Sequence, residues 1–359
     1  MKDFLKRKNI VFSARRYGID AMGAMAQGLF CSLLIGTIVK TVGQQAGFDF
    51  LIEIGGYCSA MSGPAMAVAI GYALQAPSLV LFSLATVGYA ANALGSTTLS
   101  GAAGAGGPLA VLFIAIVAAE FGKAVSKETK IDLLVTPLVT IIIGVGLSAL
   151  IAPAIGTAAS FIGEFIKIAT VMQPFWMGIL VSVVMGMALT LPISSAAICA
   201  ALGLTGLAGG AAVAGCCAQM VGFAVLSFEE NGWGGLVSQG LGTSMLQMGN
   251  IVKNPKIWIP ATLASAVTGP VATCLFNFQM NDPAGGIASG MGTCGMVGPI
   301  GVYAGWVNDV AIGAKNAVTS FDWLVMILIC FVLPAVFTLI FGRICRNLGW
   351  IKDGDLKLD

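Results

Sequence analysis

The stretch from Ile131 to Pro153, IDLLVTPLVTIIIGVGLSALIAP, contains one charged residue, Asp132, close to its start. A helix needs about 20 mostly apolar residues to cross the hydrocarbon core of a bilayer, and this stretch is long enough to do so. Similar stretches recur along the chain, so we predict an all-α polytopic membrane protein. We expect about ten spanning helices, at residues 20–40, 54–75, 77–95, 107–122, 131–153, 175–199, 201–227, 234–251, 257–279 and 322–345.

The composition of the whole chain agrees with this prediction. Of its 359 residues, 57% are hydrophobic and 9% are charged, whereas soluble domains carry about 25% charged residues. The 48 glycines suit membrane helices, because small residues let two helices approach closely. Histidine is absent, which excludes phosphotransfer, proton relay and metal binding through histidine within this chain. No two cysteines have C-x-x-C spacing, so we expect neither a metal site nor a cofactor.

Positive charges are distributed unevenly between alternate loops. If the N-terminus is cytoplasmic, the cytoplasmic segments hold 15 of the 18 Lys and Arg residues, and Lys40, Lys167 and Lys315 fall outside. Cytoplasmic loops of membrane proteins are enriched in Lys and Arg. The sequence therefore predicts that both termini lie in the cytoplasm.

Two glycine-rich stretches in the second half resemble one another. Gly234–Ser244 reads GGLVSQGLGTS, and Gly285–Cys294 reads GGIASGMGTC, with one gap at Gln239. We expect two equivalent broken elements, and we expect residues 284–305 to form a re-entrant segment rather than a plain span. Paired interrupted segments indicate the central site of a transporter.

Polar side chains gather at membrane depth in the same half of the chain. Amides and hydroxyls are costly in lipid, so they are expected to face a bundle interior or a wet cavity. Hydrogen bonding between helices is the alternative for any single residue. A carboxylate of Glu229 or Glu230 could accept hydrogen bonds from substrate hydroxyls, although both could equally lie in a solvated loop. The candidate substrate-binding residues are Ser194, Ser195, Gln219, Glu229, Glu230, Asn231, Gln239, Thr243, Ser244, Gln247, Asn250 and Thr293.

Four stretches of the second half carry a resemblance to a known family: Leu191–Ile198 (LPISSAAI), Gly215–Phe223 (GCCAQMVGF), Gly240–Gln247 (GLGTSMLQ) and Asn250–Pro260 (NIVKNPKIWIP). Together they resemble the stand-alone IIC permease component of the bacterial phosphotransferase system, in the branch that includes perfringolysin-regulator-like membrane proteins. The resemblance implies a sugar-permease IIC-like fold in the bacterial plasma membrane, as a homodimer of ten-helix subunits. It also implies that the second half carries a carbohydrate, or a similar polyhydroxylated molecule, by elevator-type motion.

The same resemblance implies a division of the chain. Residues 1–153 would form an N-terminal scaffold with the dimer interface, and residues 154–174 an amphipathic connector. Residues 175–346 would form the transport domain with its re-entrant hairpins, and residues 347–359 a cytoplasmic tail. Separate cytoplasmic IIA and IIB proteins would phosphorylate the sugar. The chain alone would therefore not be catalytic, no catalytic residue is predicted, and no contact with nucleic acid is expected.

The sequence also departs from the pattern of this family. Sugar IIC proteins carry a glutamate in a Gly-x-Thr-Glu-Pro hairpin motif, whereas Ser244 and Cys294 stand at that position here. This difference keeps two alternatives open. One is a membrane sensor or regulator that does not transport, and the other is a phosphorylation-independent transporter of another small polar solute.

Overall fold

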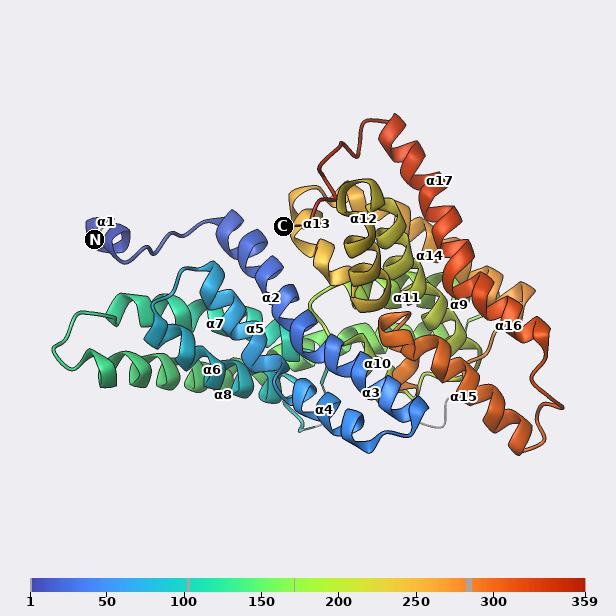
Figure 1. The fold of residues 1–359 in the computed structure, drawn as a ribbon, viewed down its shortest axis with the longest axis horizontal. Helices are drawn as coiled ribbons and strands as arrows, with labels where there is room; N and C mark the ends of the chain where they lie inside the picture. The colour runs from blue at the N-terminus through green and yellow to red at the C-terminus, as the bar shows by residue number, and fades with distance from the viewer. Residues whose placement is uncertain (1, 102–103, 171, 282–285, 359) are drawn as a thin grey trace. The chain divides into compact units, whose positions relative to one another are not determined.

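The computed structural model describes residues 2–101, 104–170, 172–281 and 286–358, and these are drawn as coloured ribbon in Figure 1. Helices form nearly all of the regular structure in this part of the chain, and its one β-type pairing is an isolated bridge between Gly206 and Met280. The chain divides into two compact units, Met1–Ser160 (unit 1) and Phe161–Asp359 (unit 2). The all-α prediction is confirmed.

Most residues of unit 1 belong to helices. Their bounds are α1 (Lys2–Arg7), η1 (Arg16–Asp20), α2 (Ala21–Leu29), η2 (Phe30–Leu34), α3 (Ile35–Ala46), α4 (Asp49–Ala60), α5 (Ser62–Ala73), α6 (Ser78–Gly95), α7 (Gly107–Val125) and α8 (Asp132–Thr170). Helix α8 continues across the boundary into unit 2, so residues 154–170 extend the helix that begins at Asp132.

Unit 2 contains shorter elements, many of them 3-10 or π turns that interrupt α-helices. Their bounds are α9 (Pro174–Thr190), α10 (Ser195–Leu202), α11 (Gly206–Leu226), α12 (Phe228–Val237), η3 (Ser238–Gly242), η4 (Ser244–Gln247), α13 (Met248–Lys253), η5 (Pro255–Trp258), α14 (Ile259–Pro270), η6 (Val271–Leu275), η7 (Ile287–Gly290), η8 (Cys294–Met296), α15 (Val297–Ala311), α16 (Ser320–Ile327), η9 (Leu328–Val332) and α17 (Leu333–Asn347).

Seven helices in the described part of the chain are long and apolar enough to cross a membrane. Because a helix satisfies its own backbone hydrogen bonds, a long apolar helix can cross hydrocarbon without help from its neighbours. Each of the seven coincides with a predicted span. They are Arg16–Gln44, Ser78–Gly95, Gly107–Val125, Asp132–Ala159, Gly206–Leu226, Pro255–Leu275 and Ser320–Asn347.

The other three predicted spans are interrupted helices. Residues 54–75 are divided at Met61 between α4 and α5. Residues 175–199 are divided where α9 ends at Thr190 and the extended Leu191 follows. Residues 234–251 are divided among four short elements, α12, η3, η4 and α13.

Glycine at helix crossings allows very close packing in unit 1. Helices α5 and α6 cross at Gly63 and Gly88, where a Cβ on Gly88 would lie 2.3 Å from the carbonyl oxygen of Gly63. In hydrocarbon, close approach of this kind is a main source of helix association, because water expulsion contributes little there.

Helix α11 forms the centre of unit 2. It packs against α9, α14 and α17, and almost all of its residues from Gly209 to Leu226 are buried. A Cβ on Gly215 would lie 1.9 Å from the carbonyl oxygen of Ser182, so α9 and α11 touch through their backbones. A buried apolar cluster that includes Val213, Cys217 and Trp306 joins α11 to the helices after residue 270.

Candidate functional site

Both glycine-rich stretches break the helical path of unit 2. In the first, η3 ends at Gly242, and Thr243 is extended (φ −159°, ψ 142°) before η4 begins. In the second, Gly292, Gly295 and Met296 all have positive φ before α15 begins. Gly285, the first residue of the second stretch, lies outside the described residues. The two stretches therefore share an interruption immediately beside a Gly-Thr pair.

The two interruptions are in direct contact. The hydroxyl of Thr293 donates a hydrogen bond to the backbone carbonyl of Gly240, and the Thr293 side chain is fully buried. A Cβ on Gly292 would lie 2.8 Å from the carbonyl carbon of Cys216, so the second interruption rests on the backbone of α11. The two broken elements and α11 thus meet at one place.

Beside this meeting point lies a set of paired polar side chains, which we call the central polar cluster: Thr190, Gln219, Ser244, Trp258 and Thr262. The hydroxyls of Thr190 and Ser244 are 2.8 Å apart. The amide oxygen of Gln219 accepts hydrogen bonds from the Trp258 indole at 2.9 Å and the Thr190 hydroxyl at 3.4 Å, and its amide nitrogen lies 3.3 Å from the Thr262 hydroxyl. Gln219, Thr190 and Ser244 are fully buried.

The second group of predicted site residues binds the C-terminal tail. We call Glu230, Asn231, Gln239, Gln247 and Asn250 the tail-binding cluster. The amide nitrogens of Asn231 and Gln247 each donate to the backbone carbonyl of Leu356 at 2.8 Å. Asn250 donates to the carbonyl of Lys357 at 2.8 Å, and Glu230 accepts from the backbone N–H of Leu356 at 2.9 Å. Gln239 joins the group through a 2.9 Å hydrogen bond from Gln247.

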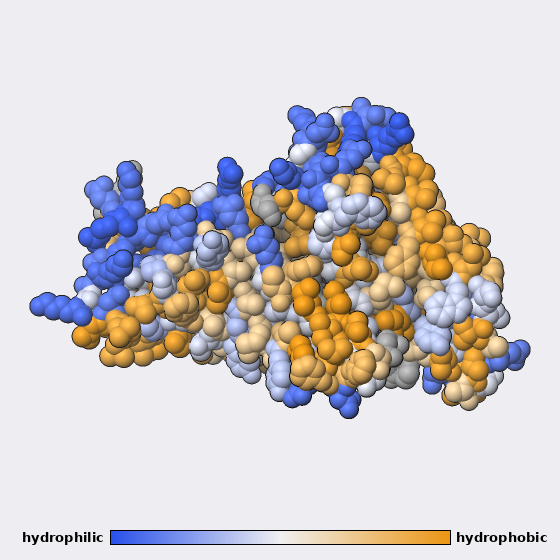
Figure 2. Space-filling model, viewed as in Figure 1, coloured by the Kyte–Doolittle hydropathy of each residue, from blue (hydrophilic) through white to orange (hydrophobic). Residues whose placement is uncertain are grey.

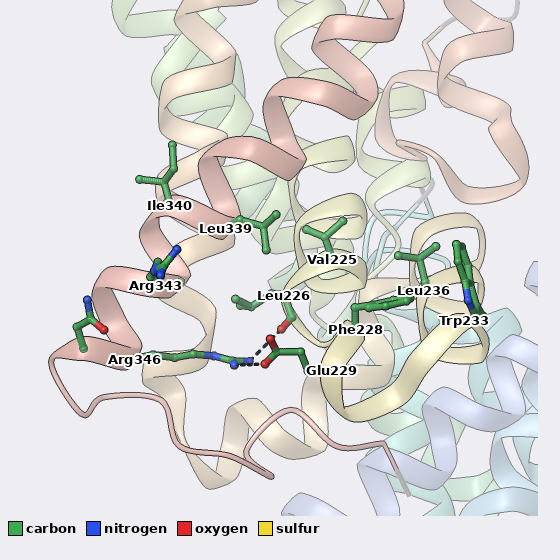
Figure 3. A pocket seen from close by; sticks show the side chains of 12 residues that line it. Val225, Leu226, Phe228, Glu229, Trp233, Leu236, Leu339, Ile340, Arg343 and Arg346 are labelled. Atoms are coloured by element: carbon green, nitrogen blue, oxygen red, sulfur yellow. Dashed lines mark hydrogen bonds and ion pairs between the residues drawn. The ribbon is translucent and has the colours of Figure 1, made fainter.

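The remaining predicted site residues lie outside both clusters. Ser195 is buried at the start of α10 and donates to the carbonyl of Gly290 at 2.7 Å, which fixes α10 to the second interruption. Ser194 lies in the turn before it. Thr243 caps η4 by accepting from the backbone N–H of Met245. Glu229 is exposed and forms an ion pair of 2.7 Å with Arg346, shown by the dashed lines in Figure 3.

Several partners in these clusters were not among the predicted site residues. Thr190, Trp258 and Thr262 belong to helices that read as ordinary apolar spans, so their hydroxyl and indole groups carried no distinguishing pattern. The tail contributes backbone carbonyls of Leu356 and Lys357, which have no sequence signature. Among the described residues there is no group of three or more His, Cys, Asp or Glu side chains that could hold a metal ion.

Comparison with known proteins gives one family. The model of the phosphotransferase system EIIC family matches residues 19–358, which is nearly the whole chain. No curated protein and no solved structure matches.

Proposed function

The chain belongs to the phosphotransferase system EIIC family, and from this premise we propose that it binds a carbohydrate, or a similar polyhydroxylated molecule, and carries it across the bacterial plasma membrane. Family membership makes the chain a multi-pass membrane transporter component and implies partner components of the same system.

The contact between the two glycine-rich interruptions is the observation that carries this proposal. Interrupted helices expose backbone groups at membrane depth, and such groups are tolerated where they are buried in protein or line a cavity. Here they meet at Thr293 and Gly240, next to the buried amide of Gln219 and the buried hydroxyl of Ser244. An amide or a hydroxyl can both donate and accept a hydrogen bond, as a sugar hydroxyl also does.

We assign the direct substrate contacts to Gln219, Thr243, Ser244 and Thr293. Ser194 and Ser195, which lie next to the second interruption, are assigned as further candidates. In this proposal a substrate replaces the hydrogen bonds that these side chains now make with protein groups. The tail-binding cluster holds backbone groups of residues 356–358. Its side chains would reach a substrate only after the tail has left them.

The proposed transport step is a rigid-body, elevator-type movement of the second unit. The division of the chain at residues 160 and 161 supports two bodies, and the polar clusters belong to the second. We propose eight crossings, which are the seven long helices and the interrupted segment 54–75. Segments 175–199 and 234–251 are assigned as re-entrant, because the ends of each lie on the same side. The carbonyl of Pro174 accepts a hydrogen bond from Thr273, while Gly206 pairs with Met280. Asn231 and Asn250 both bind the tail. We also propose a homodimer with cytoplasmic termini, in agreement with the distribution of Lys and Arg.

Phosphorylation by separate IIA and IIB proteins is the coupling that we propose. The chain has no histidine, so a phosphohistidine step would lie in those partners. A second candidate is transport without phosphorylation. Ser244 and Cys294 stand at the family's glutamate position, so the carboxylate that would accept hydrogen bonds from the substrate is missing there.

The first experiment is a thermal-shift screen of the purified protein against sugars and polyols, because a ligand that binds the native state raises its melting temperature. Gln219→Ala and Ser244→Ala should lower affinity for the ligand found, whereas Ser238→Ala, outside the central polar cluster, should not. Uptake of that ligand into vesicles is then measured with and without IIA, IIB and phosphoenolpyruvate. Binding without uptake would refute transport. An uptake rate that is the same with and without IIA, IIB and phosphoenolpyruvate would refute the coupling to phosphorylation.

A further inference from the structure

A groove lies between α12 and the second half of α17. Its floor is the end of α11, and its volume is about 1030 Å³. Figure 3 shows the side chains around it. The walls are apolar and include Val225, Leu236, Leu339 and Ile340, with Trp233 at the edge. We call this feature the α12–α17 groove. Its apolar lining does not suit a sugar, which needs hydrogen-bond partners over most of its surface.

The rim of the groove at the C-terminal end of α17 is basic. Arg346 is neutralised by the 2.7 Å ion pair with Glu229. Arg343, which also lines the groove, is exposed and makes no ion pair or side-chain hydrogen bond with any residue that the structure describes. The groove therefore combines an apolar interior with one unpaired guanidinium at its mouth.

The position of this rim along α17 corresponds to a bilayer surface. Helix α17 ends the apolar segment Ser320–Asn347, and Arg343 and Arg346 lie near the end of that segment. Figure 2 shows hydrophilic residues gathered where α17 ends, beside the apolar flank of the helix. Trp233 is 73% exposed at the edge of the groove, and exposed tryptophan is typical of the membrane–water interface.

We propose that the α12–α17 groove binds an anionic phospholipid of the surrounding bilayer. The acyl chains would lie against Leu236, Leu339 and Ile340, and the phosphate would pair with Arg343. Basic pockets between helices on the cytoplasmic side of membrane proteins bind anionic headgroups in this way. The acyl chains of a zwitterionic lipid would pack against the apolar wall equally well, but its headgroup supplies no net negative charge for the guanidinium of Arg343. Because α12 leads directly into the first interruption, the bound lipid would also brace that element against α17.

Native mass spectrometry of the purified protein in mixed micelles tests the proposal. Phosphatidylglycerol and phosphatidylcholine with identical acyl chains are offered at equal concentration. We expect phosphatidylglycerol to be retained about fivefold more than phosphatidylcholine. This ratio corresponds to the free energy with which one basic residue at a membrane surface attracts anionic lipid. Arg343→Gln should reduce this preference to about one, and Leu339→Trp, which fills the groove, should lower retention of both lipids.

Arg15→Gln is the matched control, because Arg15 is also an exposed arginine beside an apolar segment but lies in unit 1. It should keep the preference for phosphatidylglycerol. Equal retention of the two lipids by the unmodified protein would overturn the proposal, as would an unchanged preference in Arg343→Gln. A photo-crosslinker placed at Leu339 that captures a second copy of the chain in place of lipid would also overturn it.

Discussion

The side-chain amide of Gln247 donates a 2.8 Å hydrogen bond to the backbone carbonyl of Leu356, 109 residues further along the chain. The same carbonyl accepts from Asn231, and the Leu356 side chain is fully buried. The C-terminal tail is therefore an integral part of unit 2, and its backbone carbonyls accept hydrogen bonds from the side-chain amides of Asn231, Gln247 and Asn250.

Removal of residues 351–359 should destabilise unit 2 by about 2–4 kcal/mol. Buried amide donors left without partners cost about 1–3 kcal/mol each, and the burial of Leu356 is lost as well. Thermal unfolding in detergent should show a melting temperature several degrees lower. Leu356→Ala, which keeps the backbone carbonyl, should lose less. Asp353→Ala, at an exposed tail position, should change nothing. A truncated protein as stable as the full chain would show that the tail contacts contribute no net free energy.

The contact between the two interruptions should depend on one hydroxyl. Thr293→Val keeps the shape of the side chain but removes the donor to the Gly240 carbonyl, and it should cost about 1–2 kcal/mol. Thr293→Ser retains the hydroxyl and should recover most of this loss. Denaturant unfolding of both variants measures the difference. Equal stability of the serine and valine variants would mean that the hydrogen bond does not hold the two elements together.

Hydropathy was sufficient to locate the long spans, because each apolar helix satisfies its own backbone and needs no particular neighbour. The span predicted at 107–122 is the helix Gly107–Val125. Hydropathy averaged over a whole span could not locate the breaks at Met61 and Leu191, because the flanking stretches are mostly apolar although Ser62 and Pro192 follow the breaks directly.

The two glycine-rich stretches were predictable as broken elements, because both contain a Gly-x-Gly-Thr pattern that disfavours regular helix. Their contact through Thr293 and Gly240 depends on the tertiary packing of both against α11, and local sequence does not encode it. The same limit applies to the tail-binding cluster. Its amides were recognisable as unusual at membrane depth, but their partners are backbone carbonyls from the far end of the chain.

Gly215→Ala should be one of the most damaging small substitutions in unit 2. The added Cβ would lie 1.9 Å from the carbonyl oxygen of Ser182, so α9 and α11 would have to separate. Overpacking of this kind costs about 1–3 kcal/mol or more. Gly234→Ala is the control, because a Cβ there meets nothing within 4 Å. Yield and melting temperature in detergent should fall for the first variant alone. Equal behaviour of the two would contradict the close approach.

Loss of one partner of the Glu120–Lys123 ion pair within α7 should destabilise the protein more than loss of both. Its atoms are 2.9 Å apart, and the Lys123 side chain is 1% exposed. Lys123 also donates to the backbone carbonyls of Asn9 and Leu74. Lys123→Met leaves a buried carboxylate without its cation, which costs about 3–5 kcal/mol. The double variant Glu120→Gln, Lys123→Met removes that unpaired charge and should be more stable than the single variant. If the two unfold at the same temperature, the carboxylate is not destabilised by loss of Lys123.

The attachment of the N-terminal arm should weaken in acid. The hydrogen bond from Lys8, together with the charge of Arg7, holds the pKa of Glu128 below its usual value of 4.5. A carboxyl whose pKa is lower in the folded state stabilises that state above the unfolded pKa, and this contribution disappears as the pH falls through the folded value. Hydrogen exchange of arm residues 2–12, corrected for the intrinsic pH effect, should therefore accelerate below about pH 4.5. Glu128→Gln, which cannot titrate, should show fast exchange at every pH. If the variant and the unmodified protein follow the same curve from pH 6 to about pH 3.5, Glu128 does not hold the arm.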